Sequence, residues 1–195
     1  MTTAFHQEFS RRLPERRRRD TSSPARKGWE KLRYTQPMRV SVLTVSDSVS
    51  SGKAQDLSGP AVVSRCRELG WEISSADVLP DDRGAIETFL RRTADSQTAD
   101  VILTTGGTGF GPRDVTPEAT IAVAERLVPG FTEHMRAQGQ KKTKWAILSR
   151  GAAVIRGNSI ILNLPGSPKG AVESLDFVAE LLPHAIAVLH GTRHD

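Results

Sequence analysis

TTGGTGFGPRDVTPE, residues 104–118, is the stretch that most constrains the fold and the site. It follows a short apolar run at 101–103 and leads into the helix start Thr116-Pro117-Glu118, so its order is strand, glycine-rich turn, helix. Glycine lets backbone N–H groups approach an anion closely, and successive amides in such a turn form an anion-binding concavity. The stretch lacks the P-loop lysine and the glycine spacing of dinucleotide-binding turns, so it predicts a phosphate site of another kind. The alternative is a turn that only redirects the chain after a strand.

The charged pair in this stretch indicates catalysis. Arg113 adds a cation that can bind phosphate oxygens, whereas the carboxylate of Asp114 would repel a phosphate unless a metal ion or a proton lies between them. Asp114 could instead cap the following helix, although Thr116 offers a capping hydroxyl already.

Composition limits the protein to an ordinary globular class. The chain has 195 residues, of which 37% are hydrophobic and 25% charged, enough for one domain with a substantial core. The single cysteine, Cys66, excludes an internal disulfide framework and a cysteine-rich metal site, and no apolar run is long enough to span a membrane.

The net charge of +5 is unevenly distributed. Residues 1–39 hold eleven Lys and Arg against four Asp and Glu, net +7, which leaves 16 against 18, net −2, for the other 156 residues. We therefore divide the chain into a basic arm at 1–38, with a composition typical of disorder, and a domain at 39–195. The arm could contact nucleic acid, anionic lipid or an acidic partner, or be an extension without a dedicated role. Its paired arginines precede no apolar leader, so we expect a cytoplasmic protein.

From residue 39 onward, strand patterns alternate with helix patterns. This alternation predicts an α/β fold in three layers, with a mainly parallel sheet and helices on both faces. A kink is expected at Pro183. Strands are predicted at 40–45, 72–79, 101–103, 146–148, 153–155 and 160–164, and helices from Ser58 or Gly59 to 69 and at 83–93, 116–127, 129–135 and 168–189.

Four polar loops each follow a predicted strand, namely 46–52, 80–82, 104–114 and 165–169. Ligands of parallel sheets bind beyond the carboxyl ends of the strands, so these loops should build one site on one rim. They carry the carboxylates Asp47, Asp81, Asp82 and Asp114, which beside an anion cradle suit phosphoryl or nucleotidyl transfer with Mg²⁺. Lys169 could bind phosphate alongside Arg113.

Three of these acids have structural alternatives. Asp47 could cap a turn, Asp81 could begin one after a proline, and Asp82 could cap the next helix. The five histidines show no metal-ligand spacing and suggest no other chemistry.

The motifs together resemble the MogA and MoaB family of molybdenum-cofactor biosynthesis proteins, whose module also forms the G domain of molybdenum-insertion proteins such as gephyrin. The resemblance covers about residues 39–191. It is carried by Val45–Ser48, Ser51-Gly52 with Asp56 and Ser58–Pro60, Leu79–Asp81, Thr104–Gly109, Arg113–Glu118, Pro129–Phe131, Leu148–Arg150 and Asn163–Pro168.

The resemblance implies a molybdopterin-binding fold, usually trimeric, and an ATP-dependent adenylyl transfer. The terminal phosphate of molybdopterin would attack the α-phosphate of ATP with Mg²⁺, giving adenylylated molybdopterin and pyrophosphate. Asp81 and Asp114 match the aspartates regarded as essential, and we assign them to catalysis and to the metal. Substrate and nucleotide binding is expected of Ser46, Asp47, Ser48, Thr105, Gly106, Gly107, Thr108, Gly109, Arg113, Pro165, Gly166, Ser167 and Lys169.

Two alternatives stay open. Some MoaB-type members bind molybdopterin without adenylylating it, but tend to depart from the aspartate motifs that this chain retains. The basic arm could make the protein a nucleic-acid binder, although the arm has little aromatic interleaving for stacking on bases. We expect no membrane and no nucleic-acid partner, and a molybdenum-insertion protein as a possible recipient of the product.

Overall fold

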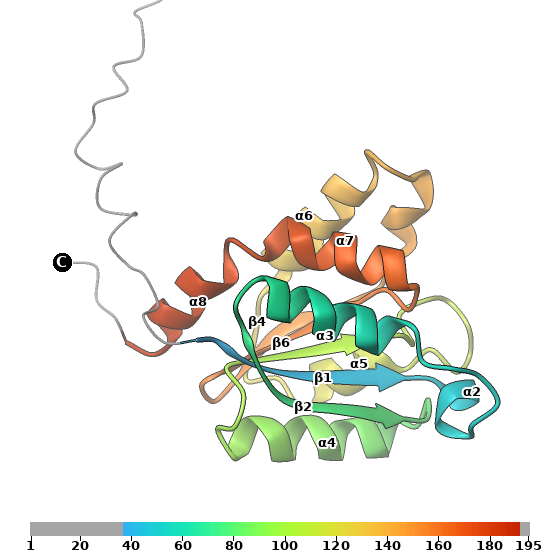
Figure 1. Ribbon diagram of the computed structural model, residues 1–195, viewed down its shortest axis with the longest axis horizontal. Coiled ribbons are helices and arrows are strands. Elements are labelled where there is room, and N and C mark those ends of the chain that lie inside the picture. Colours follow the sequence, from blue (N-terminus) through green and yellow to red (C-terminus); the bar gives the residue numbers. More distant parts are fainter. Residues whose placement is uncertain (1–36, 192–195) are drawn as a thin grey trace, which may run out of the picture. The chain divides into compact units, whose positions relative to one another are not determined.

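The computed structural model describes residues 37–191, in which β-branched and leucine-rich segments form one six-stranded sheet (Figure 1). Its order is β2-β1-β3-β6-β5-β4. The strands are β1 (Arg39–Val45), β2 (Glu72–Leu79), β3 (Val101–Thr105), β4 (Arg126–Leu127), β5 (Ala153–Arg156) and β6 (Ser159–Leu164). Strands β1, β2, β3 and β6 are parallel, while β5 pairs antiparallel with β4 and β6. The expected mainly parallel sheet is confirmed, whereas all but the last two residues of the basic arm lie outside the described residues.

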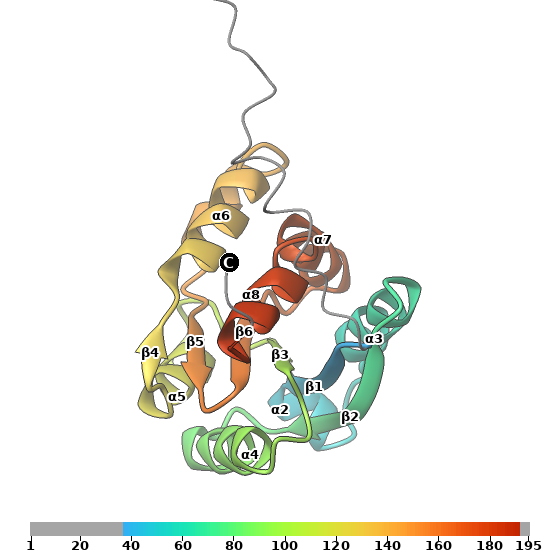
Figure 2. The ribbon, with the colours of Figure 1, turned by 90° about the vertical axis from the view of Figure 1, so that its left-hand side faces the viewer.

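Helices cover both faces of the sheet, because side chains of the buried strands alternate between two cores. The first core joins Val40 and Val42 of β1 to α3 (Ser58–Glu68), α6 (Pro129–Gly139), α7 (Pro168–Val178) and α8 (Leu182–Leu189). The second joins Leu43 and Val45 to α4 (Arg83–Asp95) and α5 (Thr116–Ala122). Figure 2 shows α4 and α5 on one side of the sheet and α3 and α7 on the other.

Residues 146–148 are not the strand that the sequence suggested. They belong to a 3-10 helix, η2 (Lys144–Leu148), which the side chain of Thr143 caps by accepting from the Trp145 amide at 3.4 Å. The apolar run does not pack into the core, since Ile147 is 51% and Leu148 44% accessible. An apolar run this short does not distinguish a strand from a helical turn.

Two helix predictions also need correction. Helix α5 ends at Ala122, and Leu127, expected on its apolar stripe, instead lies in the edge strand β4 with 63% of its surface exposed. The predicted C-terminal helix is two helices, because the chain leaves α7 after Val178 and begins α8 at Leu182. Pro183 is in the first turn of α8, where its missing N–H costs no helical hydrogen bond, so it starts a helix rather than kinking one.

The parallel strands bring the four predicted loops to one rim of the sheet. Residues 46–52 leave β1, 80–82 leave β2, 104–114 leave β3 and 165–169 leave β6, and all four strands point the same way. The first loop contains the one-turn helix α2 (Asp47–Ser50). The expectation of a shared rim is therefore met by the topology.

Candidate functional site

The turn that follows β3 is held in place by its neighbours on both sides. Gly106 and Gly107 have φ of 103° and 62°, and a Cβ on Gly106 would lie 2.2 Å from the Val45 carbonyl oxygen, so only glycine fits there. The Thr105 hydroxyl donates to the Pro165 carbonyl at 2.7 Å, and the Gly106 amide donates to the Leu164 carbonyl at 3.4 Å. The glycine turn and the Pro165 loop thus form one connected wall.

Asp47 and Asp81 hold the ends of β1 and β2 together. The Asp47 amide donates to Asp81 Oδ2 at 2.9 Å, and the Asp81 amide donates to Asp47 Oδ1 at 3.0 Å. Arg113 then donates to both oxygens of Asp47, at 3.0 and 2.9 Å. These hydrogen bonds lower the pKa of Asp47 and raise that of Arg113. Asp47 therefore links the loops that follow β1, β2 and β3. The Arg113 guanidinium, which was expected to bind phosphate, forms an ion pair with Asp47 instead.

Asp81 has the opposite electrostatic environment. Burial raises its pKa above the ordinary value, opposed by the hydrogen bond from the Asp47 amide and reinforced by the negative charges of Asp47 and Asp114. A carboxyl whose ionised form is disfavoured gains from an approaching cation. Perturbed carboxyls of this kind are concentrated at functional sites.

Asp114 is not a helix cap. Its Oδ2 accepts from the Gly111 amide at 2.7 Å, while the Asp114 amide donates to the Gly111 carbonyl at 3.0 Å, which closes a tight turn. The N-cap position of α5 is Val115, with no side-chain capping bond. Thr116, expected to cap this helix, is fully buried, and its hydroxyl has no hydrogen-bond partner within the described part of the chain.

Arg150 holds the turn that carries Asp114 through hydrogen bonds to its carbonyls, a role that the sequence did not predict. Its Nε donates to the Gly109 carbonyl and one terminal nitrogen to the Asp114 carbonyl, both at 2.6 Å, and the other terminal nitrogen pairs with Glu118. Its own amide donates to the Thr108 carbonyl at 3.1 Å. The planar, five-donor guanidinium suits such multiple contacts, and the only sign of Arg150 in the sequence was its place in the Leu148–Arg150 motif of the family resemblance.

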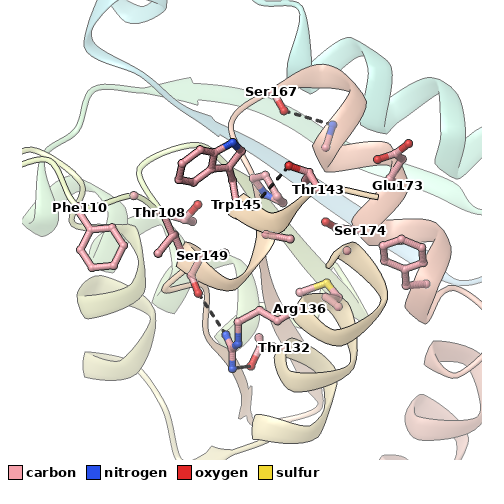
Figure 3. Close-up of a pocket in the computed structure, with 18 residues that line it drawn as sticks. Thr108, Phe110, Thr132, Arg136, Thr143, Trp145, Ser149, Ser167, Glu173 and Ser174 are labelled. Atoms are coloured by element: carbon pink, nitrogen blue, oxygen red, sulfur yellow. Dashed lines mark hydrogen bonds between the residues drawn. The ribbon is translucent and has the colours of Figure 1, made fainter. Parts of the chain in front are cut away.

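The glycine turn and the Pro165 loop contribute residues to two cavities. Most of the residues expected to bind substrate line one cavity or the other. The polar cavity, about 430 Å³, is lined by Ser46, Ser48, Asp81, Thr105, Gly106, Gly107, Asp114 and Gly166 together with residues of the 54–58 segment. The aromatic cavity, about 440 Å³, is lined by Thr108, Gly109, Phe110, Pro165 and Ser167 together with residues of α6, η2 and α7 (Figure 3). Both volumes are of the size that small-molecule ligands occupy.

The remaining expected residues lie elsewhere. Asp82 caps α4 by accepting from the Ala85 amide at 2.7 Å, in agreement with the structural alternative for that residue. Lys169 is exposed at the start of α7 and is not among the residues that line either cavity. Asp56, whose role the sequence did not indicate, accepts from the amides of Ser58 and Gly59, the first two residues of α3, at 3.1 and 3.0 Å.

A magnesium ion suits the polar cavity only if substrate phosphates supply further ligands. Within residues 37–191, no three His, Cys, Asp or Glu side chains gather into a metal site. Asp81 and Asp114 both line the cavity, and one or two carboxylates with phosphate oxygens and waters are the usual set for Mg²⁺. The unpartnered Thr116 hydroxyl is buried behind Gly107 near Asp81, since a Cβ on Gly107 would be 2.3 Å from that hydroxyl and 3.0 Å from Asp81 Oδ1, but Thr116 does not line the cavity. The donors present are therefore compatible with the ion.

Comparisons with known proteins agree with this architecture. The model of a family described as a probable molybdopterin binding domain matches residues 41–184. A molybdopterin adenylyltransferase of Helicobacter pylori strain J99 is 40% identical over 158 residues, which are 80% of this chain and 90% of that protein. The molybdenum cofactor synthesis protein cinnamon of Drosophila melanogaster is 41% identical over 153 residues, 76% of this chain but only 25% of that much longer protein.

A solved structure shares the fold as well as the sequence. The molybdopterin biosynthesis enzyme MoaB of Thermus thermophilus superposes with a TM-score of 0.75 at 46% identity, covering 81% of this chain and 99% of that one. As for membranes, none of the helices between residues 37 and 191 has both the length and the apolar character needed to cross a bilayer.

Proposed function

The chain belongs to the family of probable molybdopterin binding domains, and from this membership we propose that it is a molybdopterin adenylyltransferase. The relatives of about 40% identity that carry this name support the proposal, since the alignment with the Helicobacter pylori protein spans most of both chains. Its substrates are ATP and molybdopterin. Its products are adenylylated molybdopterin and pyrophosphate.

The observation that carries the proposal is the convergence of two carboxylates and a glycine turn on one polar cavity. Asp81 comes from the end of β2 and Asp114 from the loop after β3, and Gly106 and Gly107 line the same cavity. A phosphate cradle with adjacent acids suits transfer of a phosphorus group better than simple phosphate binding, because the acids would repel phosphate alone.

In the proposed reaction, an oxygen of the terminal phosphate of molybdopterin forms a bond to the α-phosphorus of ATP. The bond from that phosphorus to the β-phosphate oxygen breaks, and pyrophosphate leaves with the bonding electrons. Little covalent chemistry is required of the protein, whose contribution is positioning and electrostatic stabilisation. Gly107 of the glycine turn and the hydroxyls of Ser46 and Ser48 bind phosphate oxygens, and the fixed loops orient them.

Asp81 and Asp114 are the residues that would hold Mg²⁺. When bound, the ion supplies positive charge that offsets the negative charge of the phosphates. Asp81 is suited to this role because its ionised form is disfavoured in the protein alone, so that the site becomes more stable when a cation arrives. Asp47 positions Asp81 through the paired hydrogen bonds between their amides and carboxylates, and Arg113 in turn holds the Asp47 carboxylate.

The proposal is tested with purified protein, Mg-ATP and molybdopterin, by measuring pyrophosphate release and adenylylated product together. We expect one pyrophosphate for each product molecule and none when molybdopterin is omitted. Binding of molybdopterin without pyrophosphate release would reject the transferase and support the second candidate, a MoaB-type binding protein. That candidate is favoured by the close structural match to a MoaB protein.

Three further expectations belong to the same proposal. We propose that the protein forms a homotrimer, works in the cytoplasm and passes its product to a molybdenum-insertion protein. The exposed apolar side chains of Leu127 and Ile121, 63% and 51% accessible, are suited to a subunit contact. A molar mass of one chain in light scattering would contradict the trimer.

A further inference from the structure

The aromatic cavity is a second compartment of the site, with a different chemistry from the polar cavity. The two cavities are lined by consecutive residues of the same two loops. Thr105–Gly107 line the polar cavity and Thr108–Phe110 line the aromatic cavity, and the Pro165 loop contributes residues to both. The aromatic cavity contains Met135, Leu148 and Phe177, and neither Asp81 nor Asp114 lines it. The aromatic cavity is therefore suited to the flat, apolar part of a ligand whose phosphates lie in the polar cavity.

Two large aromatic side chains border this cavity and have little other packing. Trp145 is 65% and Phe110 71% exposed, although burying such a ring is strongly favourable. Figure 3 shows both rings on the same side of the cavity, with Glu173 and Ser174 on the opposite side. Lys144 Nζ lies 4.6 Å from the centroid of the Trp145 ring and makes a cation–π contact with it. This contact leaves most of the indole surface exposed.

The polar groups among these apolar walls offer both kinds of hydrogen bond. Glu173 presents carboxylate oxygens, one of which accepts from Lys142 at 3.0 Å. Arg136 makes only long hydrogen bonds, to carbonyls at 3.3 and 3.5 Å and to a hydroxyl at 3.4 Å, and no ion pair with any carboxylate of residues 37–191. A nitrogen heterocycle carries amino donors and ring acceptors on its edges, and its face stacks on aromatic side chains.

We propose that the aromatic cavity binds the flat nitrogen heterocycle of a substrate, and that this ring stacks on Trp145. This inference builds on the proposed function, which supplies two rings of the same chemistry, the adenine of ATP and the pterin of molybdopterin. Trp145 provides affinity for the ring and leaves the phosphorus chemistry to the polar cavity. Stacking of a base on an aromatic side chain corresponds to a loss of about 5- to 150-fold in affinity when the side chain is truncated.

The test uses tryptophan fluorescence with phosphate-free probes. The chain has three tryptophans, so a Trp29→Phe background leaves Trp71, which is 9% exposed, and Trp145 as the accessible indole. Adenosine and 6-hydroxymethylpterin are titrated separately, with free tryptophan as the correction for absorbed light. We expect saturable quenching by at least one probe. Trp145→Ala should raise the dissociation constant of that probe about 5- to 150-fold, measured by calorimetry, while Trp145→Phe should retain most of the affinity.

Ile147→Ala is the matched control, because Ile147 is exposed on the same 3-10 helix and does not line the cavity. It should leave both titrations unchanged, and thermal unfolding checks that each variant is folded. The inference is overturned if neither probe quenches the fluorescence, or if Trp145→Ala binds both probes as tightly as the parent. Ring binding that depends on Trp145 without pyrophosphate release would reject the proposed function alone. Pyrophosphate release that is indifferent to Trp145 would reject this inference alone.

Discussion

At the scale of single residues, Asp81 and Asp47 show how two neighbouring carboxyls acquire different tasks. Asp47 is neutralised by Arg113 and has a lowered pKa, so it is well suited to a permanent structural link. Asp81 is partly buried without an ion pair among the described residues and has a raised pKa. The pKa values of the two carboxyls differ because of their environments and not because of residue type. Asp81 is therefore the one of the two that is suited to bind a cation.

Replacing Asp81 by Asn should separate activity from stability. A raised pKa in the folded state means that folding favours the protonated carboxyl, so its stabilising contribution is present at low pH and is lost as the pH rises through that pKa. Asp81→Asn should therefore unfold at a higher temperature than the parent at neutral pH, with the gap narrowing on acidification. Its turnover should fall at least ~100-fold.

Glu133→Gln, the same chemical change at an exposed position outside both cavities, is the control for Asp81→Asn and should alter neither quantity. A neutral-pH unfolding temperature below that of the parent would contradict the electrostatic account of Asp81.

Arg150 should act on the reaction through the turn that carries Asp114. Without its hydrogen bonds to the Gly109 and Asp114 carbonyls the turn is free to shift, and a displacement of about 1 Å can cost on the order of 100-fold in rate. Arg150→Ala should lower kcat by ~10- to 100-fold with little change in the KM for ATP, and Arg150→Lys should not restore it. Steady-state kinetics on protein shown to be folded decide the matter. An unchanged kcat, or an effect confined to KM, would dismiss the positioning role.

At the scale of elements, a buried amide joins the strand that ends in the Pro165 loop to its neighbours. Asn163 of β6 donates to the hydroxyls of Thr104 in β3 and Thr120 in α5, at 2.9 and 2.8 Å, and accepts from the Ala152 amide. Asn163→Leu would leave these buried groups unpaired at a cost of about 1–3 kcal/mol each before relaxation. We expect a lower urea midpoint, corresponding to roughly 2–4 kcal/mol in the free energy of unfolding.

Leu162→Met, a volume-conserving change at an equally buried position of β6, should cost less than about 1.5 kcal/mol and is the control for Asn163→Leu. Equal midpoints for the two variants would show that the amide network adds no more than apolar packing does.

Element patterns also explain what the sequence could and could not predict. The buried strands and the rim were predictable because parallel strands read as continuous apolar runs and their loops share one edge. The 3-10 helix at Lys144–Leu148 was missed because a three-residue apolar run has no diagnostic period. The partners of Arg113 and Arg150 depend on loop contacts 32 to 66 residues apart, which spacing along the chain does not encode.

At the scale of the whole molecule, all the machinery proposed for the reaction lies between residues 44 and 177, and the family match covers residues 41–184. The basic arm lies outside this region. We therefore predict that deleting residues 1–36 leaves kcat/KM for both substrates within about twofold of the full chain, because steering by distant charge is screened beyond roughly 8 Å at physiological ionic strength. Kinetics at two salt concentrations check this. A large loss of kcat/KM at both salt concentrations would show that the arm contributes to the reaction.

The proposed chemistry in the polar cavity is tested by comparing Asp114→Asn with the full-length parent for molybdopterin binding and for molybdopterin-dependent pyrophosphate release. Asp114 lines the polar cavity, and its side chain accepts a hydrogen bond from the Gly111 amide that an Asn oxygen can also accept, so folding and pterin affinity should persist. We expect a dissociation constant within about threefold of the parent and pyrophosphate release reduced at least ~100-fold. Release at the parental rate with binding intact would contradict the proposal, because the chemistry would then lie outside the polar cavity.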